Sequence, residues 1–170
     1  MKKLDLEKRH ESMRGWFAYE LYGQMAKNPK IILVVGDFGY KVFDYIKRDF
    51  PKRFMNVGAS EQAMIGIAIG LALEDKIPIV YTVSSFILYR PFETIRNYVN
   101  HENVPIKIIG SGRNKDYLDH GLCHWAEEDK EIMKIFNNIE AVWPERFEEI
   151  PTLVDDMIKS EKPWYINLRR

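Results

Sequence analysis

Short apolar runs rich in β-branched residues alternate along the chain with segments of helical periodicity, and this alternation most constrains the fold. The clearest runs are IILVV (31–35) and IPIVYTV (77–83), whose unbroken apolar character is typical of strands buried on both faces. Strands that alternate with helices are joined by right-handed crossovers and form a parallel sheet. We therefore predict an α/β fold with three layers, a doubly wound and mostly parallel sheet between helices.

The predicted elements follow one another over residues 1–170, which we expect to form a single domain. Predicted strands cover residues 31–35, 53–57, 77–83, 104–110, 139–143 and 163–168, and predicted helices cover residues 12–26, 41–49, 61–73, 91–100, 127–136 and 146–160. We expect Ser60 to cap the helix over 61–73. Because that helix is nearly all apolar, we also expect it to be buried on all sides.

Composition narrows the class of protein. The chain has 25 Lys and Arg against 25 Asp and Glu, which argues against a nucleic-acid binder that works by bulk charge. The single cysteine, Cys123, allows no internal disulfide and fits a reducing, cytoplasmic setting. The amino-terminal residues 1–15 are basic without an apolar run, so we expect no signal peptide. The longest apolar stretch, 63–73, is too short to span a membrane.

Ligands of doubly wound sheets bind beyond the carboxyl ends of the strands, here at residues 36–37, 58–61, 84–89 and 110–124. These segments contain no P-loop, no dinucleotide fingerprint and no nucleophile elbow. The run HGLCH (120–124) offers His120, Cys123 and His124 to a metal ion but no clear further ligand, so two ordinary histidines in a polar loop are the simpler interpretation. A nucleophilic Cys123 has no more support.

Glu61 stands out because it is a carboxylate at the start of an apolar helix. Taken alone, it is an acid that supports the helix N-terminus. Its surroundings are more specific, because six segments, in order and at matching spacing, resemble the pyrimidine-binding domain of the transketolase family of thiamine-diphosphate enzymes, here as a stand-alone subunit. They are MRGWFAYELYGQMAKNPKIILVVGDFG, RFMNVGASEQAMIGIAIGLAL, SSFILYRPFETIRN, VPIKIIGSG, DHGLCHWAEEDKEIM and PWYINLRR.

The resemblance implies a cofactor-binding role for several residues. Glu61 is implied to hydrogen-bond N1′ of the aminopyrimidine of thiamine diphosphate and so to help activate the thiazolium ring. Phe86, with Tyr89 and Val83, matches the aromatic turn that stacks on the aminopyrimidine, and Asp37 matches an acid close to the cofactor. The simpler alternatives are an aromatic cluster that packs the core or an interface, and an aspartate in a strand-end turn.

Substrate-binding roles are implied for both ends of the chain and for one loop. Arg14 and Arg170 match arginines that bind a sugar phosphate, a task that suits the planar guanidinium, although both are equally consistent with solvated arginines. His124 matches a retained catalytic and substrate-binding histidine. His120 replaces an aspartate of the family. A histidine expected early in the loop is missing, since Gly112 or Arg113 stands there, so we expect an altered substrate pocket.

The resemblance also implies a partner. The family holds the diphosphate and Mg²⁺ on a separate domain with a GDG motif and a later asparagine, and GDFG (36–39) does not match that motif. We therefore expect a second polypeptide to carry that domain, so that thiamine diphosphate and Mg²⁺ bind across an interface and this chain contributes no metal ligand. Two copies of each chain would satisfy closed symmetry, with the helix over 61–73 at the centre of the contact.

The expected function is the transfer of a two-carbon ketol unit between phosphorylated or otherwise activated sugars, by a split, transketolase-like enzyme. Two alternatives remain open from the sequence. One is the pyrimidine-binding subunit of a split thiamine-diphosphate-dependent 2-oxo acid decarboxylase. The other is a non-catalytic assembly or regulatory subunit that has kept the fold.

Overall fold

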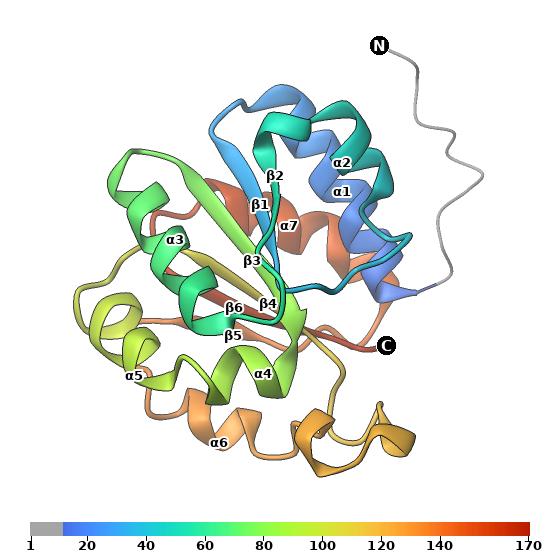
Figure 1. Ribbon diagram of the computed structural model, residues 1–170, viewed down its shortest axis with the longest axis vertical. Coiled ribbons are helices and arrows are strands. Elements are labelled where there is room, and N and C mark those ends of the chain that lie inside the picture. The colour runs from blue at the N-terminus through green and yellow to red at the C-terminus, as the bar shows by residue number, and fades with distance from the viewer. Residues whose placement is uncertain (1–11) are drawn as a thin grey trace.

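A six-stranded sheet forms the middle layer of the protein, in a computed structural model that describes residues 12–170 (Figure 1). The strand order is β2-β1-β3-β4-β6-β5, and all neighbouring strands are parallel. The strands are β1 (Ile31–Val35), β2 (Phe54–Asn56), β3 (Ile77–Val83), β4 (Lys107–Ser111), β5 (Glu140–Val142) and β6 (Trp164–Leu168). The predicted doubly wound parallel sheet is confirmed. Most of the basic amino-terminal segment, for which no signal peptide is expected, lies outside the described residues.

Helices cover both faces of the sheet and make the other two layers (Figure 1). One face carries α1 (Met13–Lys27), α2 (Asp44–Asp49) and α7 (Ile150–Lys159). The other carries α3 (Glu61–Leu73), α4 (Ser84–Tyr89), α5 (Phe92–Thr94), a π-helix (Ile95–His101) and α6 (Asp129–Met133). Among residues 12–170, no helix is long and apolar enough to cross a bilayer.

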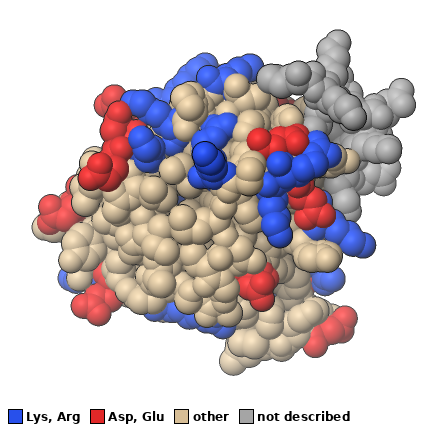
Figure 2. Space-filling model, turned by 45° about the horizontal axis from the view of Figure 1, so that its top comes forward, with Lys and Arg blue, Asp and Glu red and all other residues tan. Residues whose placement is uncertain are grey.

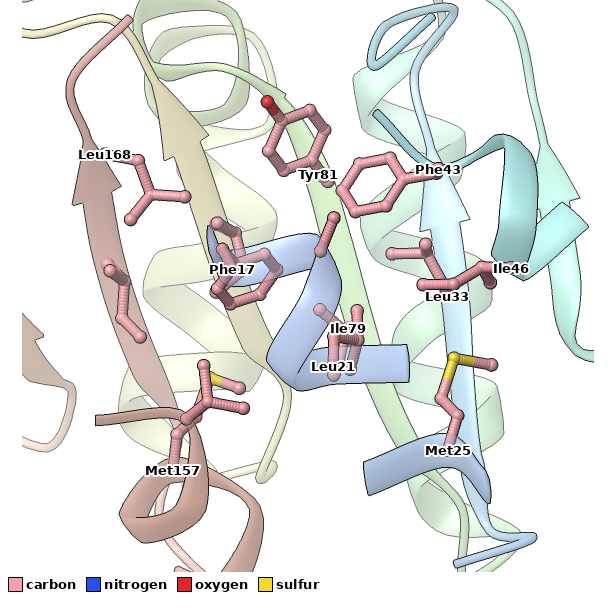
Figure 3. Packing of buried hydrophobic residues seen from close by; sticks show 14 of the residues in the cluster. Phe17, Leu21, Met25, Leu33, Phe43, Ile46, Ile79, Tyr81, Met157 and Leu168 are labelled. Carbon is pink, nitrogen blue, oxygen red and sulfur yellow. The ribbon is translucent and has the colours of Figure 1, made fainter. Parts of the chain in front are cut away.

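The periodicity of α1 explains how the first face is packed. Its N-terminus is capped by Ser12, whose side-chain oxygen accepts a hydrogen bond from the Gly15 amide at 3.1 Å. Phe17, Leu21 and Met25 recur every four residues, so they share one side of the helix. That side packs onto the β1 and β3 strands in a core closed by α7 (Figure 3).

The helix predicted over 91–100 differs from what the structure shows. A separate helix, α4, begins directly after β3, and the chain then passes through α5 into the π-helix. The spacing of apolar residues cannot distinguish an α-helix from a π-helix. The two differ only in whether each backbone hydrogen bond spans four or five residues along the chain.

One prediction about α3 also needs correction, and its predicted burial on all sides is not reached within this chain alone. Ser60 is at the N-cap position, but its hydroxyl donates to the Val57 carbonyl at 2.7 Å and makes no side-chain cap. The helix is not buried on all sides within this chain, because it lies in an outer layer and turns only one face to the sheet. It buries Glu61, Met64, Ile65, Ala68 and Ile69 and leaves Gln62, Ala63, Gly66, Gly70 and Leu73 exposed.

A buried lysine joins β4 to the turn that follows α7. The Lys107 side chain is 1% exposed, and its ammonium donates to the carbonyls of Ser160, at 2.8 Å, and Lys162. Burial lowers the pKa of Lys107 to about 8 from its ordinary value of 10.5. The folded chain therefore binds fewer protons at this site than the unfolded chain between these two pH values.

We expect this site to make folding stability rise with pH, because a group that is protonated more in the unfolded state favours unfolding at lower pH. Relative to the Lys107→Met variant, the unaltered chain should gain roughly 2 kcal/mol of unfolding free energy between pH 8 and pH 10. Urea unfolding of both chains at the two pH values measures this difference, in which the titration of shared tyrosines cancels. A difference that stays constant with pH would contradict the prediction.

Candidate functional site

The site lies where the order of the strands reverses. The chain leaves β1 for β2 on one side and later returns to β3 on the other, so the loops that follow these strands diverge and open a crevice at their carboxyl ends. A cavity of about 230 Å³ occupies this place. Its lining residues come from four separate parts of the chain and are Gly36, Asp37, Phe38, Ala59, Glu61, Thr82, Val83, Phe86, Tyr117, His120 and His124.

Glu61 supplies a buried carboxylate to this cavity. It is the first residue of α3 and is 1% exposed. Its Oε2 accepts a hydrogen bond from Nη1 of Arg90 at 2.7 Å. Its Oε1 is buried and has no hydrogen-bond partner among residues 12–170. Buried polar atoms are nearly always satisfied, so this oxygen is an unused acceptor on a residue that lines the cavity.

Aromatic rings line the same cavity. The ring centroids of Phe86 and His124 are 4.8 Å apart, and those of Phe38 and Tyr117 are 6.1 Å apart in an edge-to-face arrangement. Val83, which ends β3, is almost fully buried beside them. A cavity with aromatic walls and one unsatisfied carboxylate oxygen suits a flat, polar heteroaromatic ring. The aminopyrimidine of thiamine diphosphate is such a ring, so these residues fit it.

The two histidines lie together at the loop side of the cavity, with ring centroids 5.0 Å apart. Burial lowers the pKa of His124, and the neighbouring His120 lowers it further, so His124 is neutral at pH 7. The Cys123 thiol is 3.2 Å from Nδ1 of His124. Within residues 12–170, no three His, Cys, Asp or Glu side chains come together as a metal site. The structure therefore gives no support to a metal site at HGLCH.

Tyr117 is a cavity residue that the sequence motifs did not single out. Gly112 has a φ of +90°, and a Cβ built there would lie 2.2 Å from Cε2 of Tyr117. The tyrosine ring thus fills the space that a side chain at position 112 would need. Arg113 points elsewhere, since its guanidinium bonds the carbonyls of Asn167 and Pro144 and pairs with Glu145 at 2.9 Å. Neither Gly112 nor Arg113 therefore supplies a side chain to the cavity, and Tyr117 of the same loop lines it.

The two candidate phosphate-binding arginines contact the cavity residues Phe38 and Tyr117 but do not themselves line the cavity. The Arg14 guanidinium is 5.9 Å from the centroid of Phe38, and the Arg170 guanidinium is 5.0 Å from that of Tyr117. Nε of Arg14 is buried without a hydrogen-bond partner in the described part of the chain. The structure thus brings the two ends of the described chain to the same aromatic pair.

Asp37 and Tyr89 have different positions relative to the cavity. Asp37 lines the cavity. Its backbone is in the left-handed region, with a φ of 50°, and its amide donates a hydrogen bond to Oδ1 of Asn56 at 3.0 Å. Tyr89 is not among the residues that line the cavity. It is 41% exposed, and its hydroxyl donates to Glu128 at 2.8 Å. Arg90, the next residue, is the one that reaches Glu61.

Comparison with known proteins agrees with this geometry. The family model described as "Transketolase, pyrimidine binding domain" matches residues 11–170. One of the subunits of the apulose-4-phosphate transketolase of Actinobacillus succinogenes is 31% identical over 128 residues, which cover 75% of this chain and 41% of that protein. The chain spans about half the length, or less, of three curated relatives that it matches.

Solved structures show the same relationship. A structure described as a split-gene transketolase, inactive beta4 tetramer, is 30% identical with a TM-score of 0.82, and the match covers 94% of this chain and 51% of that one. The transketolase of Leishmania mexicana has a TM-score of 0.84 at 17% identity, over 98% of this chain and 26% of that one. By its sequence, its fold and the family model that spans nearly all of it, the chain belongs to the family of transketolase pyrimidine-binding domains.

Proposed function

We propose that this chain is the pyrimidine-binding subunit of a split, thiamine-diphosphate-dependent enzyme that transfers a two-carbon ketol unit between sugars. The observation that carries the proposal is the unpartnered Oε1 of Glu61 in an aromatic-walled cavity of the described chain. Thiamine diphosphate, when bound, supplies a carbon centre that accepts and releases the ketol unit. The remaining chemistry falls to side chains of this chain and of its partner.

Each cavity residue has a defined task in this proposal. Glu61 Oε1 would share a proton with a ring nitrogen of the aminopyrimidine, and Phe86 and Val83 would hold that ring in position. His124 has a second ring nitrogen, Nε2, with which to accept or donate a proton at the substrate. His120 and Tyr117 shape the substrate side of the cavity.

The arginines indicate the substrate class. Arg14 and Arg170 flank one aromatic pair near the cavity, and guanidinium groups bind phosphate through planar, charge-assisted hydrogen bonds. A phosphorylated or otherwise activated sugar that lies along Phe38 and Tyr117 would meet both. This geometry favours a sugar substrate over the simple 2-oxo acid of a decarboxylase.

A partner chain would complete the site. The residues that fit the cofactor hold only its ring, so we propose that the diphosphate and Mg²⁺ bind to a second subunit with the GDG motif. Support comes from α3, whose outward residues are uncharged and include Ala63, Gly66, Gly70 and Leu73. Figure 2 shows a broad area without charged side chains on the side of the molecule where α3 lies. We propose that this face packs against the partner, in an assembly of two copies of each chain.

The proposal predicts that the isolated chain has no measurable turnover and that activity requires the second subunit. The test is to copurify this chain with its partner, load the complex with thiamine diphosphate and Mg²⁺, and assay ketol transfer between sugar phosphates. Release of CO₂ from 2-oxo acids, without ketol transfer, would establish the decarboxylase alternative. A complex that binds no thiamine diphosphate would contradict both enzymatic functions and favour the assembly subunit.

A further inference from the structure

Arg90 touches two cavity residues while it stays outside the cavity. It is the C-cap residue of α4, and its side chain is 44% exposed. Its guanidinium carbon lies 3.7 Å from the centroid of the Phe86 ring, and Nη1 donates to Oε2 of Glu61 at 2.7 Å. Arg90 is not among the residues that line the cavity. One side chain thus contacts both the acid and the Phe86 ring without lining the cavity.

The helical spacing explains this double contact. Phe86 and Arg90 are four residues apart, so they lie on the same side of α4, one turn apart. The planar guanidinium can stack on the Phe86 ring and still donate along its edge to a carboxylate. A lysine ammonium could pair with Glu61 but has no flat surface for the ring.

The contact also distinguishes the two oxygens of Glu61. Oε2 is engaged by Arg90, and Oε1 has no partner among the described residues. A buried carboxylate whose cation is removed is poorly solvated and tends to rearrange. Arg90 thus engages one oxygen of Glu61 and leaves the other without a partner among the described residues.

We propose that Arg90 is a positioning residue that holds Oε2 of Glu61 and the Phe86 ring in place, so that Oε1 is presented to the cofactor ring. This inference rests on the proposed function, because it concerns the same site. It adds a residue that acts on the acid and on the ring together, without itself lining the cavity.

The first test needs no cofactor. Urea unfolding is measured for the complete chain and for the variants Arg90→Gln, Glu61→Gln and the double variant. We expect Arg90→Gln to lower the midpoint in the unaltered background, because it leaves a buried carboxylate unpaired. In the Glu61→Gln background the same change should have much less effect. Additive shifts would overturn the proposed coupling. Arg96→Gln, at an exposed arginine of the following π-helix, is the matched control.

The second test uses the reconstituted complex. At saturating thiamine diphosphate we expect Arg90→Gln to lower kcat by about 10-fold or more, because a misplaced catalytic group slows chemistry. Arg96→Gln should stay within about 2-fold. Arg90→Lys should restore the unfolding midpoint but only part of the turnover, since it regains the charge and not the stacked plane. A merely structural role predicts that lysine restores both equally.

The two tests keep the inference separate from the proposed function. If the unaltered complex binds no thiamine diphosphate, the proposed function fails and the role of Arg90 in presenting Glu61 to that cofactor fails with it. If the unaltered complex turns over, and Arg90→Gln is as active as Arg96→Gln, the inference fails while the proposed function stands.

Discussion

Turnover by the assembled enzyme is expected to fall by at least about 100-fold when Glu61 is replaced by glutamine. The amide has nearly the same shape as the carboxylate, and its oxygen can still accept from Arg90, so the fold should persist. The change removes the ability to exchange a proton at the position of Oε1, the buried oxygen that lacks a partner among the described residues. Hydrogen bonding alone cannot replace that step.

The measurement is ketol transfer by complexes that carry Glu61→Gln, at saturating thiamine diphosphate and with unfolding curves recorded in parallel. Glu93→Gln is the matched control, because it makes the same chemical change at an exposed glutamate of α5 on the same side of the sheet. It should leave turnover within about 2-fold of the unaltered complex. Near-normal activity of Glu61→Gln, in a complex that binds the cofactor, would remove Glu61 from the mechanism.

The sheet could be predicted from the sequence because its central strands are marked by composition. IILVV and IPIVYTV are buried on both faces, so they read as continuous apolar runs, and the structure places β1 and β3 over those residues. The helices after β3 could not be predicted in the same way. Ser84–Tyr89 is too short for a periodic pattern to emerge, and the π-helix differs from an α-helix only in its hydrogen-bond ladder.

The position of the site followed from topology, but its internal contacts did not. The strand-end rule pointed to the segments that contain Glu61, Phe86 and His124, and the structure places all three around one cavity. On α4, however, Arg90 lies about 40° to one side of Phe86 and Tyr89 about 60° to the other. Only the three-dimensional structure shows that Arg90 turns to Glu61, which is 29 residues away in sequence, and that Tyr89 turns to Glu128.

The support beneath this site depends on a second buried acid, Asp129 at the start of α6. It is 2% exposed, and its Oδ2 accepts from Trp143 at 2.7 Å, from the Tyr165 hydroxyl at 3.2 Å and from the Asn167 amide. Asn167 in turn accepts from the Ser84 hydroxyl at 3.0 Å. One carboxylate thus links α6, the end of β5, β6 and the first residue of α4.

We expect Asp129→Ala to lower the unfolding free energy by about 3–5 kcal/mol, because it removes the acceptor of three donors, two of which, on Tyr165 and Asn167, are fully buried. Asp129→Asn should lose less, since a neutral carbonyl oxygen still accepts, though more weakly than a carboxylate. Urea unfolding followed by circular dichroism measures both losses, and the asparagine variant keeps the comparison possible if the alanine variant does not fold.

The matched control is Asp155→Ala on α7, where the carboxylate is partly exposed and pairs with Lys159 on the helix surface. Such a pair contributes less than about 1 kcal/mol. Equal losses for Asp129→Ala and Asp155→Ala would show that the buried network contributes little. A large loss only at Asp129 would show that a single acid holds α4 and α6 to the sheet. The position of Phe86, two residues after Ser84, would then depend on a carboxylate that never meets the cavity.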